Sequence, residues 1–389
     1  MHKNIQKLKG VDRMAQRHYP GETIGIIGSS ISAAVLAQAA GKLGYRVASL
    51  VTSENNPVRQ FATWQTVTDS YNEQVLRYFS ERVDVVTVDM GILSNRDFQL
   101  LASLTDLTLS EDLIAITTDR LIEKAYLDSN KCLVAPFSLV TNLTDLKEAV
   151  EYIGFPCILK STQRHVKDAD QHIILYSEED YDLAVNKLDE TTCILEAWIP
   201  TEKKASVTVI RNERGEILIY PVFEVKEQGD ELGRQVRYPA QVSKNVEQEM
   251  NRLAQYLADS LHLVGSLTLK VLITSAEVVY INEASIGLSD EAMFTIGSMS
   301  ISHYEAAARA ILGLPLPNLH VKSRAAISLS ATNLNEENLL TQLMLRTDWG
   351  FALFNPLKNE TDRIIGQVIV TGDSLSECER QIQITELTK

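Results

Sequence analysis

The chain has 389 residues, of which 45% are hydrophobic, and it carries a formal net charge of -14. This length and apolar content predict two or three domains with substantial cores. Because the balance is acidic and no basic run is longer than Lys203-Lys204, we expect no nucleic-acid partner.

Cysteine usage and hydropathy indicate a reducing, cytoplasmic setting. The four cysteines lie far apart without metal-ligand spacing, so we expect them to be small buried side chains. Residues 1–22 form a polar tail that lacks the apolar core of a signal peptide. No apolar run reaches the roughly 18 to 20 residues that cross a bilayer, so we expect no membrane association.

The N-terminal part has the pattern of a Rossmann-like unit. Residues 23–28 form a short apolar run closed by glycine, 32–43 have helical spacing, and 47–51 form a second strand. This strand-helix-strand order, with a further strand at 83–88, predicts a parallel sheet flanked by helices. We place this domain at residues 23–108.

The glycine turn at the first strand-to-helix junction leaves two interpretations open. Gly25 and Gly28, followed by Ser29-Ser30, could offer backbone N–H groups and a helix dipole to a phosphate. A complete dinucleotide fingerprint needs a third glycine, which this chain lacks. The turn either contacts a ligand or is a tight connection without one.

The central part mixes helices and strands. We expect helices at 110–124, 145–152, 246–263 and 303–312, and strands at 155–160, 171–176, 192–198, 205–210, 216–222, 266–274 and 277–282. These elements predict a central domain at 109–316, divided near residue 191. A small β-rich domain is expected at 317–389.

Five polar residues in the central part could hold a triphosphate. Lys124 lies on a predicted helix, Lys160 and Glu196 lie at strand ends, and Asn282-Glu283 close the last strand of the domain. Two ammonium groups suit phosphate oxygens, and a carboxylate suits the Mg²⁺ that bridges them. Each residue alone is better explained as a solvated charge; their order and strand context favour a site.

Several segments together resemble a known family. The matching segments are residues 25–36, 119–124, 135–137, 154–160, 194–200, 220–222, 279–283 and 306–316. Over residues 22–375 the chain resembles the 5-(carboxyamino)imidazole ribonucleotide synthases, the ATPase subunit of phosphoribosylaminoimidazole carboxylase. The resemblance implies an α/β ATP-grasp fold with an N-terminal Rossmann-like (pre-ATP-grasp) domain.

The resemblance also implies an activity and a ligand set. The family uses ATP and bicarbonate to carboxylate 5-aminoimidazole ribonucleotide in purine biosynthesis, releasing ADP and phosphate, and is commonly dimeric. It implies that Lys124 and Lys160 bind ATP phosphates, that Glu283 beside Asn282 holds Mg²⁺, and that a hinge meets adenine. The hinge comprises Glu196, Ala197, Trp198 and Ile199, with Glu196 accepting from the adenine amino group. No catalytic residue is assigned.

Several polar positions depart from the family pattern. The loop at 164–171 lacks the glycines that would close over phosphates. Lys204 stands where an acid would contact the ribose, and Lys270 stands where a second carboxylate would bind Mg²⁺. The Lys270 ammonium either weakens the Mg²⁺ site or takes over part of the role of the cation.

Residues 284–295 also lack the arginine and histidines that the family has after Glu283. Because fold-forming residues match while site residues differ, three functions remain open. The chain is a working synthase, a non-catalytic relative that binds a nucleotide or a partner, or an ATP-grasp ligase for another acid and amine.

Overall fold

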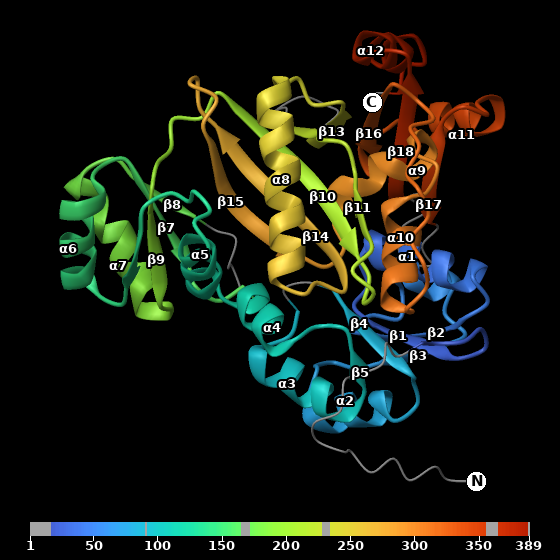
Figure 1. The fold of residues 1–389 in the computed structure, drawn as a ribbon, viewed down its shortest axis with the longest axis horizontal. Helices are drawn as coiled ribbons and strands as arrows, with labels where there is room; N and C mark the ends of the chain where they lie inside the picture. Colours follow the sequence, from blue (N-terminus) through green and yellow to red (C-terminus); the bar gives the residue numbers. More distant parts are fainter. Residues whose placement is uncertain (1–16, 90–91, 165–171, 228–233, 355–364, 388–389) are drawn as a thin grey trace.

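The computed structural model describes residues 17–89, 92–164, 172–227, 234–354 and 365–387. Most of the N-terminal tail and most of the loop at 164–171 lie outside these residues. Four sheets and their helices form the described part (Figure 1). No described helix is both long and apolar enough to cross a membrane.

The N-terminal domain is the predicted Rossmann-like unit. Its five parallel strands have the order β3-β2-β1-β4-β5. Its elements are β1 (Thr23–Ile27), α1 (Ile31–Lys42), β2 (Arg46–Val51), η1 (Pro57–Gln60), β3 (Trp64–Val67), α2 (Glu73–Ser80), β4 (Val85–Val88), α3 (Asn95–Leu104) and β5 (Asp106–Leu107). Both ends of β1 and β4 are buried, as expected for inner strands of a parallel sheet.

The connection to the next domain contains a correction. The single helix predicted at 110–124 is two helices, α4 (Glu111–Thr118) and α5 (Arg120–Ser129). Asp119 between them has an extended backbone, and its carboxylate accepts from the N–H groups of Leu121 and Ile122 at 2.8 and 3.2 Å. An aspartate that caps the next helix in this way ends the preceding one.

A small antiparallel sheet, of order β6-β9-β7-β8, forms one lobe at the left of Figure 1. Its elements are β6 (Phe137–Val140), α6 (Leu143–Ile153), β7 (Cys157–Ser161), β8 (Ile173–Leu175), η2 (Glu178–Asp180), α7 (Tyr181–Glu190) and β9 (Cys193–Ala197). Strand β7 pairs antiparallel with β8, the strand that follows it. Helices α6 and α7 cover this sheet with a core of its own.

A second antiparallel sheet, of order β11-β10-β14-β15, faces the first lobe. Its elements are β10 (Lys203–Arg211), β11 (Ile217–Ile219), α8 (Lys244–Ser260), β14 (Gly265–Ile273) and β15 (Val279–Ile286). Helix α8 lies across one face of this sheet (Figure 1). Strands β10 and β11 form an antiparallel hairpin.

Strand β15 is longer than predicted. It continues past Asn282 and Glu283 to Ile286, so these two residues lie inside the strand and not at its end. Lys270 pairs with Glu283 and Val271 pairs with Ile281, which leaves Asn282 as the extra residue of a β-bulge. The two consecutive polar residues interrupt the apolar alternation, which is why the sequence pattern predicted a strand end there.

The C-terminal sheet has the order β12-β13-β16-β18-β17. It joins β12 (Glu224–Glu227) and β13 (Arg234–Tyr238) to the later elements η3 (Asp290–Phe294), α9 (Thr295–Ser298), α10 (His303–Ile311), β16 (Ala325–Ser330), η4 (Ala331–Asn333), α11 (Glu336–Leu345), β17 (Gly350–Phe354), β18 (Ile365–Gly372) and α12 (Leu375–Ile384). Pairing of β13 with β16 ties the middle of the chain to its C-terminal part. The domain limits given above stay predictions.

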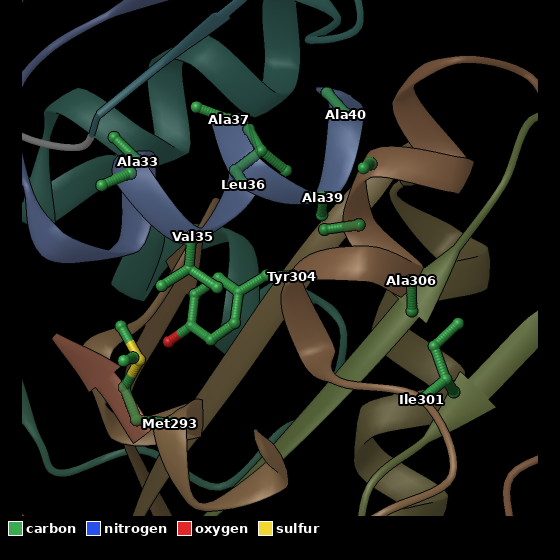
Figure 2. Close-up of a cluster of buried hydrophobic side chains, with 14 of the residues drawn as sticks. Ala33, Val35, Leu36, Ala37, Ala39, Ala40, Met293, Ile301, Tyr304 and Ala306 are labelled. Carbon is green, nitrogen blue, oxygen red and sulfur yellow. The ribbon is translucent and has the colours of Figure 1, made fainter. Parts of the chain in front are cut away.

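A shared apolar core joins the N-terminal domain to the rest. Apolar side chains of α1, such as Ala33 and Leu36, belong to one buried cluster with Tyr304 and Ala306 of α10 (Figure 2). Alanine-rich faces let two helices approach closely, and burial of their apolar surface stabilises the contact by about 25 cal/mol per Å². The four cysteines are free and buried, as predicted.

Candidate active site

A cavity of about 980 Å³ opens between the two antiparallel sheets. It is lined by residues of the segment that joins β9 to β10 and by residues of β7, β14 and β15. This volume is at the upper end for small-ligand pockets. A second, more polar cavity of about 300 Å³ shares Lys160, His172, Glu196 and Asn282 with it. The two cavities together can hold an elongated ligand with an apolar and a charged end.

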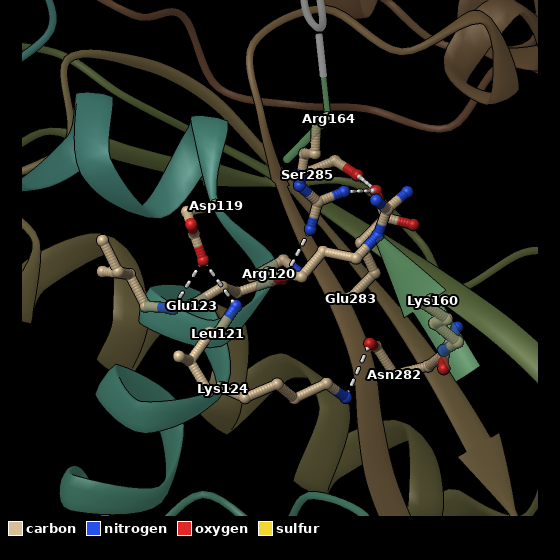
Figure 3. A network of polar contacts seen from close by, with 12 residues as sticks. Asp119, Arg120, Leu121, Glu123, Lys124, Lys160, Arg164, Asn282, Glu283 and Ser285 are labelled. Atoms are coloured by element: carbon tan, nitrogen blue, oxygen red, sulfur yellow. Dashed lines mark hydrogen bonds and ion pairs between the residues drawn. The ribbon is translucent and has the colours of Figure 1, made fainter. Parts of the chain in front are cut away.

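Two lysines and one glutamate meet where the cavities join. The Glu196 carboxylate lies 3.0 Å from the Lys160 ammonium and 3.4 Å from that of Lys124. Lys124 also donates to the backbone carbonyls of Ile281 and Asn282, at 3.3 and 2.9 Å. Figure 3 shows the Lys124 side chain extending from α5 to the backbone carbonyl of Asn282, at the bulge. The structure therefore brings together the predicted residues of a helix and three strands.

Burial and charge act against each other at these three side chains. Burial lowers the pKa of Lys160, and Glu196 opposes this shift. Burial raises the pKa of Glu196, but Lys124 and Lys160 outweigh it and hold that pKa below its usual value. All three are at most 7% exposed. The single Glu196 carboxylate neutralises only one of the two ammonium charges, and the remaining positive charge is available to an anionic ligand.

The hinge segment lines the larger cavity. Glu196, Ala197, Trp198 and Ile199 are all lining residues. The N–H groups of Ala197 and Trp198 donate to the carbonyls of Pro136 and Pro156 at 2.9 and 3.1 Å. Within the described part of the chain, the Ile199 N–H has no backbone acceptor and is left for the edge of a base. The observed partners of the Glu196 carboxylate are the lysines, so its contact with an adenine amino group stays a prediction.

Glu283 lies in a network of ion pairs. Lys270, directly opposite on β14, is 3.3 Å from one Glu283 oxygen, and Arg164 is 3.1 Å from the other. Burial raises the pKa of Glu283, but Lys270 and Arg164 outweigh it and bring that pKa to about 2. The carboxylate is therefore ionised and already neutralised by two side-chain cations.

The network extends on both sides of Glu283. Arg164 also pairs with Glu123, which accepts from the N–H of Ala284 (Figure 3). Lys270 lies 3.6 Å from Glu291, which in turn pairs with Arg234. Arg164, Glu123 and Glu291 were not predicted as site residues, because their contacts join segments far apart in the sequence.

These residues do not fit a divalent cation. Mg²⁺ requires several oxygen ligands in octahedral geometry, whereas the described residues contain no cluster of three or more His, Cys, Asp or Glu side chains suited to a metal. Near a protein surface, two unit charges about 4 Å apart repel by about 4 kcal/mol, and a divalent ion doubles this cost for each neighbouring cation. Lys270 and Arg164 would both oppose Mg²⁺ at Glu283.

The glycine turn of the N-terminal domain has an internal partner. Ser30 at the N-terminus of α1 donates to Asp89 from its backbone N–H and from its hydroxyl, each at 2.9 Å. Burial raises the pKa of Asp89 to about 6, while the Ser30 bonds oppose that shift. Since the carboxylate of Asp89 takes the place where an anion would meet the helix end, the geometry favours a turn without a ligand.

Glycine at position 28 is required by this arrangement. Its φ is +125°, and a β-carbon added there would overlap the Asp89 side chain. The second glycine of the turn therefore makes room for a carboxylate of the same chain.

Comparison with known proteins gives the family. The model of the ATP-grasp domain matches residues 125–304, and that of the ribonucleotide synthetase preATP-grasp domain matches residues 21–117. The N5-carboxyaminoimidazole ribonucleotide synthase of Bacillus subtilis is 33% identical over 302 residues, covering 77% of this chain and 78% of that protein. The protein of the same name from Staphylococcus aureus strain COL is 25% identical over 364 residues, covering 93% and 96%.

Solved structures agree with the sequence comparison. The ADP complex of an N5-carboxyaminoimidazole ribonucleotide synthetase superposes with a TM-score of 0.85 at 29% identity, covering 96% of this chain and 98% of that one. The two domain matches, the level of identity and the shared architecture lead to one conclusion. The chain belongs to the N5-carboxyaminoimidazole ribonucleotide synthase family of ATP-grasp proteins.

Proposed function

We propose that this chain binds an adenine nucleotide, ATP or ADP, between its two antiparallel sheets. The observation that carries the proposal is the joined pair of cavities, with the hinge at one end and Lys124 and Lys160 at the other. Adenine occupies the larger cavity beside Trp198 and Ile199, and the phosphates occupy the smaller one. Membership in a family with a solved ADP complex supports nucleotide binding.

The charge of the smaller cavity suits a polyphosphate. Its lining in the described residues comprises five cationic and three acidic side chains, namely Arg120, Lys124, Lys160, Arg164, Lys270, Glu123, Glu196 and Glu283. A di- or triphosphate supplies the missing negative charge, and charge-assisted hydrogen bonds to it are each worth about 1.5 to 3 kcal/mol. We also propose that the protein is a cytoplasmic homodimer and that it acts on small molecules.

Isothermal titration calorimetry with ADP and ATP tests nucleotide binding. Replacing Lys160→Met removes one phosphate contact, and we expect it to weaken ADP binding by roughly 10- to 100-fold. Lys42→Met is the matched control, because Lys42 is an exposed lysine paired with Glu305 outside the cavity. Absence of heat with both nucleotides, or equal affinity of the Lys160 variant, would contradict the proposal.

A second candidate is ATP-dependent carboxylation of 5-aminoimidazole ribonucleotide, the activity in the name of the 33% identical relative. The retained Lys124, Lys160 and Glu196 favour it, and the lack of a fitting metal site at Glu283 opposes it. ADP release by the purified protein should rise when the ribonucleotide and bicarbonate are added together. No rise at any Mg²⁺ concentration would exclude this activity and leave nucleotide binding untouched.

A further inference from the structure

Around Glu283, side-chain cations lie between carboxylates, as a metal ion does in a metal site. Lys270 on β14 lies between two carboxylates, 3.3 Å from Glu283 and 3.6 Å from Glu291. Arg164 lies between two others, bridging Glu123 and Glu283. In each case a cation of the chain occupies the space between acids that would otherwise repel one another.

Both cations also line the phosphate end of the site. Arg164 and Lys270 belong to the lining of the 300 Å³ cavity, next to Lys124 and Lys160. Their acidic partners hold them in place, since the Glu283 and Glu291 side chains are 26% and 4% exposed. Cations that are fixed before the ligand arrives lose little freedom when they bind it.

The lining of the smaller cavity carries more positive charge than its acidic side chains neutralise. Because five cationic side chains face three acidic ones in its described lining, the cavity attracts an anion with no added ion. Burial lowers the pKa of Lys270, but Glu283 and Glu291 outweigh it and raise that pKa, so the ammonium stays charged at neutral pH.

We propose that Lys270 and Arg164, fixed by Glu283, Glu291 and Glu123, replace the divalent cation, so that this chain binds the phosphates of an adenine nucleotide without a metal. The inference rests on the proposed nucleotide site and adds the form of the ligand, which is the free nucleotide and not its magnesium complex. A free nucleotide carries more negative charge than the complex, which matches the positive excess of the cavity.

The Lys270→Glu variant of the full chain tests the substitution of a metal by a side chain. It places a second carboxylate opposite Glu283 and should weaken ADP binding in excess EDTA by at least about tenfold. It should also create binding that depends on Mg²⁺, because two facing carboxylates are ligands for a hard cation. Lys270→Met is the matched control, which removes the ammonium without adding an acid; it should weaken binding in EDTA and create no dependence on Mg²⁺.

The decisive measurement is the dissociation constant of ADP, by calorimetry, in excess EDTA and in excess MgCl₂, with inorganic pyrophosphate as a competitor. For the unmodified chain we expect ADP to bind in EDTA and to bind at least about tenfold more weakly in excess MgCl₂, where most of the ADP is the magnesium complex, and we expect pyrophosphate to displace ADP in EDTA. Binding seen only with MgCl₂, or a Lys270→Glu variant with unchanged affinity in EDTA, would overturn the inference. Absence of binding under both conditions would instead overturn the proposed nucleotide site.

Discussion

The N-terminus of α1 and the cavity between the antiparallel sheets both offer groups that suit an anion, but the chain neutralises them differently. At α1, the donors of Ser30 are taken by the carboxylate of Asp89. In the cavity, Glu196 serves both Lys124 and Lys160 and leaves positive charge over. The comparison teaches that anion-binding groups indicate a ligand site only when the chain does not supply the anion itself.

The largest expected effect comes from removing the shared counter-ion of the cavity. Glu196→Gln leaves two buried ammonium groups without their shared carboxylate, and we expect it to lower the free energy of unfolding by about 3 to 5 kcal/mol. Urea denaturation measures the change. Glu249→Gln is the matched control, because its pair with Arg252 is exposed and contributes about 1 kcal/mol or less. Equal effects of the two substitutions would show that Glu196 does not neutralise the lysines.

The second effect concerns the Asp89 carboxylate at α1, which destabilises the folded state when it is ionised. The folded pKa of Asp89, about 6, exceeds the ordinary aspartate value of 3.8. The folded state therefore binds the proton more tightly than the unfolded state, and stability falls as the pH rises from about 4 to about 6. Asp89→Asn removes this dependence.

Unfolding of both proteins at pH 4.5 and 7.5 measures the difference. Relative to the unmodified chain, the Asp89→Asn variant should gain about 2 kcal/mol of stability on going from the lower to the higher pH. Parallel pH profiles would mean that the carboxylate does not titrate in this range and that its environment is less apolar than the packing indicates.

The smallest effect separates the two regions most cleanly. Ser30→Ala removes the bond to the Ala33 N–H and the hydroxyl bond to Asp89, and should cost about 1 kcal/mol of stability. Because the nucleotide binds elsewhere, the affinity for ADP should stay within about twofold. Ser243→Ala, at the N-terminus of α8, is a matched cap control. A large loss of ADP affinity only in the Ser30 variant would place the nucleotide at α1.

The sequence predicted the fold and the proximity of Lys124, Lys160 and Glu196, for identifiable reasons. Apolar runs closed by glycine or lysine locate β1 and β7, and the order of Lys124, Lys160 and Glu196 along these elements places them at one site. The break at Asp119 was missed although aspartate is a common N-cap, because the apolar periodicity continues through it.

Contacts between distant segments could not be predicted in the same way. Asp89 meets Ser30 across 59 residues, and Arg164 meets Glu283 across 119. No local pattern encodes such pairs. The bulge at Asn282 also changes which side chains share a face, and it lets Glu283 face Lys270 from inside a strand. The replacement of a metal ligand by Lys270, facing Glu283, was visible in the sequence, whereas its second carboxylate partner, Glu291, was not.

A crystal structure of the full chain grown with ADP in the presence of EDTA tests the comparison most directly. The account predicts adenine beside Trp198 and Ile199, phosphates within hydrogen-bond distance of Lys160 and Lys270, and Asp89 still bonded to Ser30. A diphosphate that displaces Asp89 at the N-terminus of α1, or a cavity without nucleotide at saturating ADP, would contradict it.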